Sequence, residues 1–249
     1  MSILIDGGLD ATSLSQALDS RLPSWQRRLD TVVLTSPRAE HLGGLQDVVT
    51  RFQIAEVIDA GMLHPSTAYA LWRRTISERG LHYVPVTQST TITVGTQVAL
   101  QILWPGLHLH KGASEIRDNG LVVRLVTAHM SMLLLGATAQ SKYALAGLVA
   151  TLPLNYLRAS IVQVIGEVDK QFPAELTEVL RQAQPSLLVI TPGVLSAKMR
   201  KSGATSIITL PPALLLNTGF VPHMQVIQTA QAGTTEISNT TSGWGIDTT

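Results

Sequence analysis

The stretch 34-LTSPRAEHLGGL-45 has the outline of a metal-binding loop. An apolar run, 31-TVVL-34, leads into it and predicts a strand, and apolar positions at helical spacing follow it. His41 is the one good transition-metal ligand in this stretch. The sequence therefore raises the question whether the loop binds a metal or keeps only the shape of a loop that does.

Strand and helix patterns alternate in the first and last parts of the chain, and short strands fill the middle. Strands are predicted at residues 3–5, 31–35, 55–59, 82–86, 91–94, 97–103, 121–126, 130–135, 160–165, 186–191, 206–210, 224–229 and 234–237. Helices are predicted near residues 11–22, 42–52, 66–80, 139–148 and 174–183. Ser66 can cap the start of the third helix and Gly80 its end, and Pro173 suits the first turn of the last.

Two sheets packed face to face, with helices outside each, would bury both sheets and explain the continuous apolar strands. The halves show no sequence repeat, and no linker rich in Pro, Gly or Ser divides them. We therefore predict an α/β protein with one αββα four-layer sandwich over residues 1–238. The tail 239–249 is predicted to be disordered.

The composition excludes several classes of protein. Hydrophobic residues make up 45% of the 249 residues and charged residues 14%, with a formal net charge of +1, so a dedicated nucleic-acid binder is not indicated. With no cysteine, disulfides and thiolate metal sites are excluded. No apolar run reaches the roughly 18 residues that span a bilayer. The expectation is a cytoplasmic protein, with membrane association through a partner left open.

Seven segments, in this order and spacing, resemble the metallo-β-lactamase superfamily, and more narrowly the soluble hydrolase-like domain of ComEC, the channel protein of bacterial DNA uptake. The segments are 3-ILIDGG-8, 30-DTVVLTSPRAEHLGGL-45, 56-EVIDAGMLHPSTAYALW-72, 118-DNGLVVRL-125, 133-LLLGATAQSKYALAGL-148, 161-IVQVIGEVD-169 and 228-QTAQAGTTEI-237. The resemblance implies the αββα fold and a two-metal hydrolase site. The first strand of the family, which carries Asp-Val-Gly-x-Gly-Asp, has no counterpart, so an exposed sheet edge is expected. Three explanations stay open: a partner strand covers this edge, the chain is shortened from a longer protein, or the N-terminus rearranges.

The metal ligands that the resemblance implies are mostly replaced. The family's Thr-His-x-(His/Asp)-x-Asp-His motif, its bridging aspartate and its His-His loop fall on Ser36, Arg38, Glu40, His41, Ala137, Gly166 and Glu167. Ser36 is a weak neutral ligand, and the Arg38 guanidinium has no lone pair to offer. We hypothesise that Arg38 replaces the metal by pairing with Glu40 and Asp6; the alternative is that Arg38 points to solvent.

No cofactor is therefore expected. The alternative is one weakly bound divalent cation, Mg²⁺ or Mn²⁺, at Glu40, His41, Glu167 and Asp169, since these ions prefer oxygen ligands. Asp118 is a further possible neighbour of the pocket.

Other histidines and glycines have competing interpretations. His108 and His110 have a spacing that suits one metal, yet no third ligand is identifiable, which favours surface histidines. His64 can serve at the entry of a helix or contact a substrate. The pair Gly43-Gly44 permits close packing of a helix on a sheet, or alternatively cradles a phosphate.

These patterns predict a catalytically inactive protein of the metallo-β-lactamase fold, a pseudo-hydrolase, that acts as a structural or interaction subunit. Its expected partner is another protein or a second copy of the chain. The alternatives are a residual metal-dependent phosphodiesterase or nuclease, and a DNA-binding module in DNA uptake. The near-zero net charge argues against tight DNA binding.

Overall fold

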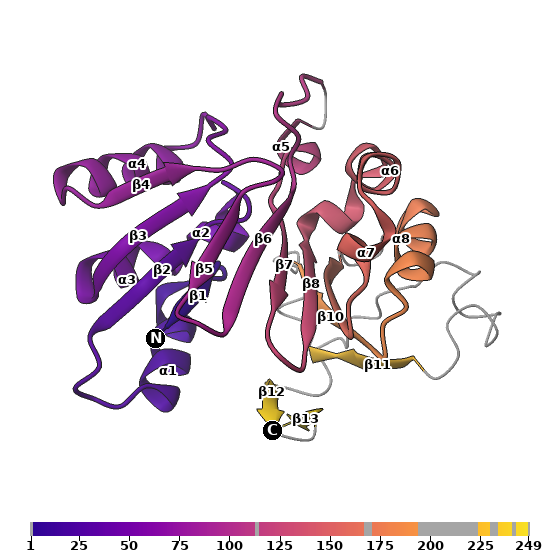
Figure 1. The fold of residues 1–249 in the computed structure, drawn as a ribbon. Coiled ribbons are helices and arrows are strands. Elements are labelled where there is room, and N and C mark those ends of the chain that lie inside the picture. The colour runs from indigo at the N-terminus through magenta and orange to yellow at the C-terminus, as the bar shows by residue number, and fades with distance from the viewer. Residues whose placement is uncertain are drawn as a thin grey trace, which may run out of the picture.

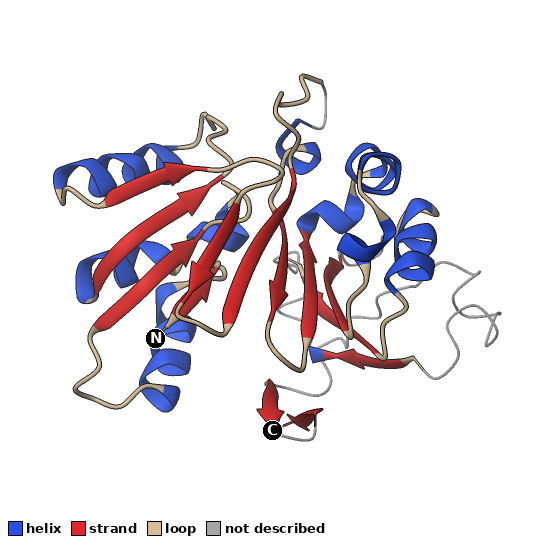
Figure 2. Ribbon diagram, viewed as in Figure 1, coloured by secondary structure: helices blue, strands red, loops and turns tan. Residues whose placement is uncertain are grey.

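The computed structural model describes residues 2–112, 115–166, 171–193, 224–229, 234–240 and 243–248. The described strands form a four-stranded sheet in the order β1-β2-β3-β4, a seven-stranded sheet in the order β11-β10-β9-β8-β7-β6-β5, and the hairpin β12-β13 (Figures 1 and 2). The strands are β1 Ile3–Ile5, β2 Arg28–Val33, β3 Gln53–Asp59, β4 His82–Pro85, β5 Thr91–Val94, β6 Val98–Trp104, β7 Val122–Val126, β8 Ser131–Gly136, β9 Ile161–Gly166, β10 Leu187–Pro192, β11 Gln225–Gln228, β12 Thr235–Thr240 and β13 Gly243–Thr248.

The helices connect the strands and lie outside the two sheets. They are α1 Ala11–Arg21, α2 Ala39–Leu42, α3 Leu45–Arg51, α4 Thr67–Glu78, α5 Glu115–Asp118, α6 Lys142–Thr151, α7 Leu154–Leu157 and α8 Glu175–Ala183, with a 3-10 helix at Ala137–Gln140. Among these described helices none is both long and apolar enough to cross a membrane.

The smaller sheet is wholly parallel, and its outer face packs on α1, α3 and α4. Parallel strands bury both faces, which explains why the last three residues of β2 and of β3 are all buried. In α4 the buried residues Tyr69, Trp72 and Ile76 share one face, and the Ser66 hydroxyl caps the helix by accepting from the Tyr69 amide at 3.2 Å.

The larger sheet has two parts. Strands β5 to β8 are antiparallel, and β8 to β11 run parallel with their neighbours. Its outer face packs on α6, α7 and α8, where α8 buries Leu176, Val179, Leu180 and Ala183 on one side. The helix follows Pro173, as predicted, although the first helical residue is Glu175.

A third apolar layer joins the two sheets. Val33 and Ile58 from the smaller sheet meet Leu100, Ile102 and Val123 from the larger sheet, and all five are nearly fully buried. The sheets therefore pack face to face between two helical layers, and the predicted αββα sandwich is confirmed.

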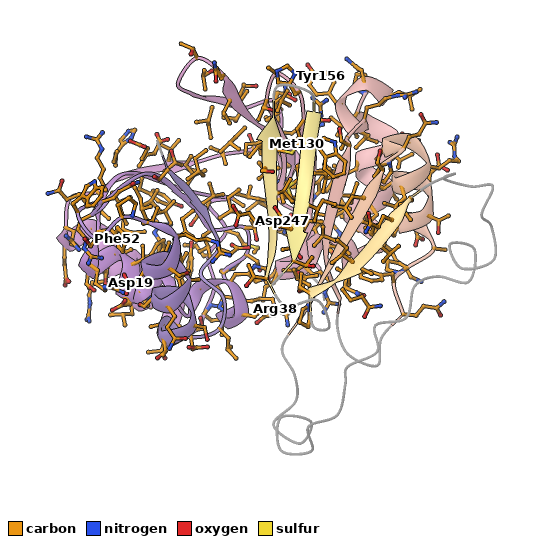
Figure 3. The ribbon with its side chains drawn as sticks, turned by 90° about the horizontal axis from the view of Figure 1, so that it is seen from below. Asp19, Arg38, Phe52, Met130, Tyr156 and Asp247 are labelled. Atoms are coloured by element: carbon orange, nitrogen blue, oxygen red, sulfur yellow. The ribbon has the colours of Figure 1, made fainter. Side chains whose placement is uncertain are left out.

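The tail 239–249 was expected to be disordered; in the structure its first two residues end β12, and residues 243–248 form a further strand. This strand, β13, pairs antiparallel with β12. Ile237, Trp244 and Ile246 pack against an apolar cluster around Ile161 and Leu187 on the inner face of the larger sheet. Figure 3 shows the hairpin, with Asp247 labelled, lying across this sheet. The hairpin is ordered because it covers apolar surface that the narrower sheet does not reach.

The helix predicted after His41 is divided into α2 and α3 at Gly43-Gly44. The strand predicted at 206–210 lies outside the described residues. Within the described part of the chain β1 pairs only with β2, so it forms one edge of the smaller sheet.

Candidate functional site

The candidate site lies at the carboxyl ends of β1 and β2, which are adjacent because the two strands run parallel. Asp6 follows β1 with a positive φ of 60°. Its Oδ1 accepts a hydrogen bond from the Thr35 amide at 2.7 Å, and its Oδ2 accepts from the Thr35 hydroxyl at 2.6 Å. The same Oδ2 lies 2.7 Å from Nδ1 of His41. The sequence elements 3–8 and 30–45 thus meet at one carboxylate.

His41 is held with its ring almost fully enclosed. A carboxylate can only accept, so Nδ1 carries the proton that His41 donates to Asp6. Burial lowers the pKa of His41, but the Asp6 carboxylate, assisted by Glu40, outweighs burial and raises the pKa above 6.5, while Arg38 opposes this rise. Nε2 is buried and has no hydrogen-bond partner in the described part of the structure.

The motif positions Ser36 and Arg38 have different surroundings. Ser36 is buried, and its hydroxyl likewise finds no hydrogen-bond partner among the described atoms. Nε of Arg38 forms an ion pair with Oε1 of Glu40 at 2.5 Å, with 31% of the Arg38 side chain and 16% of the Glu40 side chain exposed. Figure 3 labels Arg38 near the junction of the two halves of the sandwich. Arg38 therefore pairs with Glu40 as hypothesised, whereas Asp6 is bound by Thr35 and His41.

Glycines bring the two loops of the site into contact. A Cβ on Gly43 would lie 2.0 Å from the carbonyl oxygen of Leu9, and a Cβ on Gly44 would lie 2.2 Å from that of Gly7. The amide of Gly7 donates to the carbonyl oxygen of His41 at 2.6 Å. Close packing of backbone on backbone requires residues without a Cβ at these positions. The glycine pair therefore holds the Asp6 turn against the start of α3, as one of the two interpretations predicted.

The larger sheet contributes further positions of the motif. Ala137 begins the 3-10 helix after β8, and the preceding Gly136 lies beside Thr35, since a Cβ there would be 3.7 Å from the Thr35 hydroxyl. Gly166 ends β9, the neighbouring strand. Glu167 and Asp169 lie outside the described residues.

Two predicted neighbours of the pocket belong to other clusters. His64 stays near α4: its Nδ1 accepts from the Ser66 amide at 3.2 Å and lies 2.8 Å from the Ser66 hydroxyl, which supports a role at the helix entry. Asp118 is buried, accepts from the Ser141 hydroxyl at 2.6 Å and lies 3.0 Å from Nδ1 of His110. These contacts anchor the loop 105–120 on the start of α6.

The side chains of this site do not fit a metal ion well. In the described ranges, no three His, Cys, Asp or Glu side chains gather closely enough to hold one. The unpaired Nε2 of His41 is a suitable donor atom only when His41 is neutral. Asp6 is committed to Thr35 and His41, and Arg38 adds a permanent positive charge close by.

Two features of this region were missed from the sequence. Thr35 holds Asp6 through both its amide and its hydroxyl, and its position directly after an apolar run was the available signal. Asp59, at the end of β3, accepts from the Tyr83 hydroxyl at 2.5 Å and from the Gly61 amide at 2.6 Å. A hollow of about 10 Å³ between Thr35 and Asp59 has room for about one water molecule.

Comparison with known proteins gives a likeness of shape alone. No family model matches the chain, and no curated protein matches its sequence. Among solved structures, the fold is similar to that of CmlA, a diiron β-hydroxylase from Streptomyces venezuelae, with 15% identity, a TM-score of 0.44 and coverage of 69% of this chain and 36% of CmlA.

Two other similar structures are Zn²⁺-bound PqqB from Methylobacterium extorquens and a metallo-β-lactamase from Pontibacter korlensis. For PqqB the identity is 11%, the TM-score 0.43 and the coverage 67% of this chain and 57% of that one. For the metallo-β-lactamase the identity is 18%, the TM-score 0.39 and the coverage 65% of this chain and 73% of that one. The chain thus spans less than two thirds of the length of CmlA and of PqqB. The αββα assignment rests on the packed layers described above.

Proposed function

We propose that this chain is a pseudo-hydrolase: an αββα domain that has replaced a metal site by internal ion pairs and acts by binding a protein partner. The observation that carries the proposal is the pairing of Asp6 with His41 and of Arg38 with Glu40. Among the residues that the structure describes, the carboxylates of Asp6 and Glu40 each pair with a basic side chain of these loops. Because Arg38 offsets the charge of Glu40, this pair offers little net negative charge to attract a cation near His41.

The interaction role is supported by the surface. Charged residues are only 14% of the chain, against roughly 25% in typical soluble domains. Several large apolar side chains face solvent, and they include Trp25 at 83%, Leu63 at 81% and Leu107 at 78% exposure. Leu63 and Leu107 lie in loops that follow β3 and β6, and apolar side chains of this kind are suited to contact a partner protein.

The test compares metal binding by the wild-type chain with that of a variant in which the ligands are restored. Both proteins are incubated with Zn²⁺ or Mn²⁺, dialysed and assayed by elemental analysis. The restored variant carries Ser36→His, Arg38→His and Ala137→Asp. We expect the wild type to retain far less than one ion per chain and the variant to retain more. Stoichiometric metal in the wild type would contradict the proposal.

An activity assay and a mass measurement complete the test. Hydrolysis of a generic phosphodiester that is abolished by His41→Ala would identify a residual phosphodiesterase instead. Native mass spectrometry of the purified chain, alone and after affinity isolation, tests the interaction role. An inert monomer that enriches no protein above a tag-only control would refute that role.

A further inference from the structure

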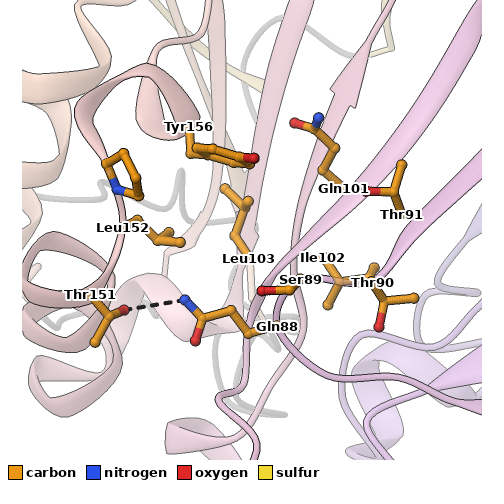
Figure 4. Close-up of a pocket in the computed structure, with 11 residues that line it drawn as sticks. Gln88, Ser89, Thr90, Thr91, Gln101, Ile102, Leu103, Thr151, Leu152 and Tyr156 are labelled. Atoms are coloured by element: carbon orange, nitrogen blue, oxygen red, sulfur yellow. Dashed lines mark hydrogen bonds between the residues drawn. The ribbon is translucent and has the colours of Figure 1, made fainter.

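A second site lies on the outer face of the larger sheet, away from the Asp6–His41 loops. A cavity of about 250 Å³ opens between the start of β5, the strand β6 and the turn from α6 to α7 (Figure 4). Its floor includes Gln101 and Leu103 of β6, and Thr151, Leu152 and Tyr156 form the wall. The volume is below the roughly 300–1,000 Å³ of sites for drug-sized ligands, so it suits a ligand about one ring in size.

The lining carries no charge. Its eleven residues are amides, hydroxyls and apolar side chains, namely Gln88, Ser89, Thr90, Thr91, Gln101, Ile102, Leu103, Thr151, Leu152, Pro153 and Tyr156. An ionised ligand would lose water here without gaining an opposite charge, which is unfavourable. Arg124 lies close by but is not a lining residue: its Nε donates to the Arg158 carbonyl at 3.0 Å and its NH1 to Oε1 of Gln101 at 2.9 Å, and these bonds hold it against neutral groups. The cavity is therefore suited to a neutral ligand.

The polar groups are oriented by their neighbours. Because Arg124 occupies Oε1 of Gln101, the amide group of Gln101 remains as a donor. Gln88 donates from Nε2 to the Thr151 hydroxyl at 3.3 Å, which leaves its Oε1 as an acceptor. The Gln101 amide thus offers a donor to the cavity, whereas Oε1 of Gln88 turns away from the other lining side chains (Figure 4).

The cavity also contains side-chain hydroxyls, which can both donate and accept hydrogen bonds. Within the described ranges, the side-chain hydroxyls of Ser89, Thr90, Thr91 and Tyr156 form no hydrogen bond with the protein, so they are available to bind a ligand. Tyr156 is 40% exposed and adds an aromatic face beside them. Neutral hydroxyl-rich rings match this lining, because each sugar hydroxyl can donate and accept and the C–H face of the ring packs on an aromatic side chain.

We propose that this cavity binds a neutral sugar ring of about hexose size. Gln101 donates to one ring hydroxyl, the hydroxyls of Ser89, Thr90 and Thr91 bind others, and the Tyr156 ring packs against the carbohydrate. This inference is independent of the pseudo-hydrolase proposal, because it uses none of the residues of the metal-loop region.

Saturation-transfer NMR on the full chain with a panel of neutral methyl glycosides tests the proposal. We expect neutral glycosides to bind, and Gln101→Leu and Tyr156→Ala each to weaken binding about fivefold or more, the factor expected for one lost hydrogen bond or packing contact. Tyr156→Phe keeps the aromatic face and should retain most of the binding. Gln16→Leu, at an exposed position on α1, is the matched control and should bind as the wild type does.

Charged analogues and nucleosides separate this proposal from its competitors. Uronic acids and amino sugars should bind more weakly than the neutral glycosides, because the cavity holds no countercharge. Thermal unfolding of each variant confirms that it is folded, and Thr91→Val is a second lining variant should Gln101→Leu not fold. The proposal is overturned if no neutral glycoside binds, if Gln101→Leu or Thr91→Val binds like the wild type, or if a nucleoside binds better.

Discussion

Replacing Gly43 by alanine tests whether the contact between the two loops holds the site together. The added Cβ would lie 2.0 Å from the Leu9 carbonyl oxygen, whereas ordinary contact begins at 3.4 Å. The turn and the helix start must therefore separate by about 1.4 Å, the difference between these distances. Both contacting groups are backbone, so no side chain can move aside to relieve the clash.

The energetic cost follows from two contributions. Overpacking of a well-packed region costs about 1–3 kcal/mol. Separation of the loops also weakens the bonds from the Gly7 amide to the His41 carbonyl and from the Gly44 amide to the Gly8 carbonyl, each worth about 1 kcal/mol. We expect a loss of roughly 3–5 kcal/mol of unfolding free energy. At about 2–4 °C per kcal/mol, the melting temperature should fall by roughly 6–20 °C.

Thermal and urea unfolding monitored by circular dichroism measure this loss, with two glycine controls. Gly106→Ala meets its nearest atom at 3.8 Å and should stay within about 0.5 kcal/mol of the wild type. Gly80 has a φ of +60° in open space, so Gly80→Ala isolates backbone strain and should cost about 1 kcal/mol. If Gly43→Ala unfolds like Gly106→Ala, the close contact is refuted. A loss of phosphate binding without a loss of stability would support the phosphate-cradle interpretation instead.

Three other predictions concern single side chains. The pKa of His41 is raised, so its ion pair with Asp6 stabilises the fold fully below pH about 6.5 and less as the pH rises through the pKa of the folded state. The difference in unfolding free energy between the wild type and His41→Gln should therefore shrink as the pH rises. A difference that does not change with pH would contradict this prediction. Burial and Asp59 raise the pKa of Tyr83, so ultraviolet titration should show it un-ionised at pH 10; Tyr83→Phe should cost about 1.5–3 kcal/mol in urea unfolding. Trp72→Ala should cost about 3–5 kcal/mol by the same assay, against less than about 0.5 kcal/mol for the exposed Trp25→Ala.

Much of the fold was predictable because its elements are specified locally. The apolar runs that became β2, β3 and β10 are buried on both faces, and Ser66 caps α4 as its side-chain chemistry indicates. The terminal hairpin was not predictable in this way. Its glycines and hydroxyl residues resemble a disordered segment, and Trp244 and Ile246 are ordered only by a sheet that is distant in sequence.

The candidate site was predictable as a set of positions and less so as a set of contacts. The pair formed by Arg38 and Glu40 follows from residues two apart in one loop. The choice of Asp6 to bind His41 depends on the parallel register of β1 and β2 and on backbone contacts at the glycines. These features depend on the tertiary structure and cannot be predicted from the types of side chain alone.

The terminal hairpin has a consequence for the order in which the protein folds during synthesis. Residues 3–85 form the entire parallel sheet with its helices, so this half can assemble as soon as it has been translated. Strands β12 and β13 follow every described strand of the sheet that they cover. Until residues 235–248 have been synthesised, the apolar surface around Ile161 and Leu187 stays open to solvent. The larger sheet is therefore the part of the nascent chain most in need of protection from aggregation.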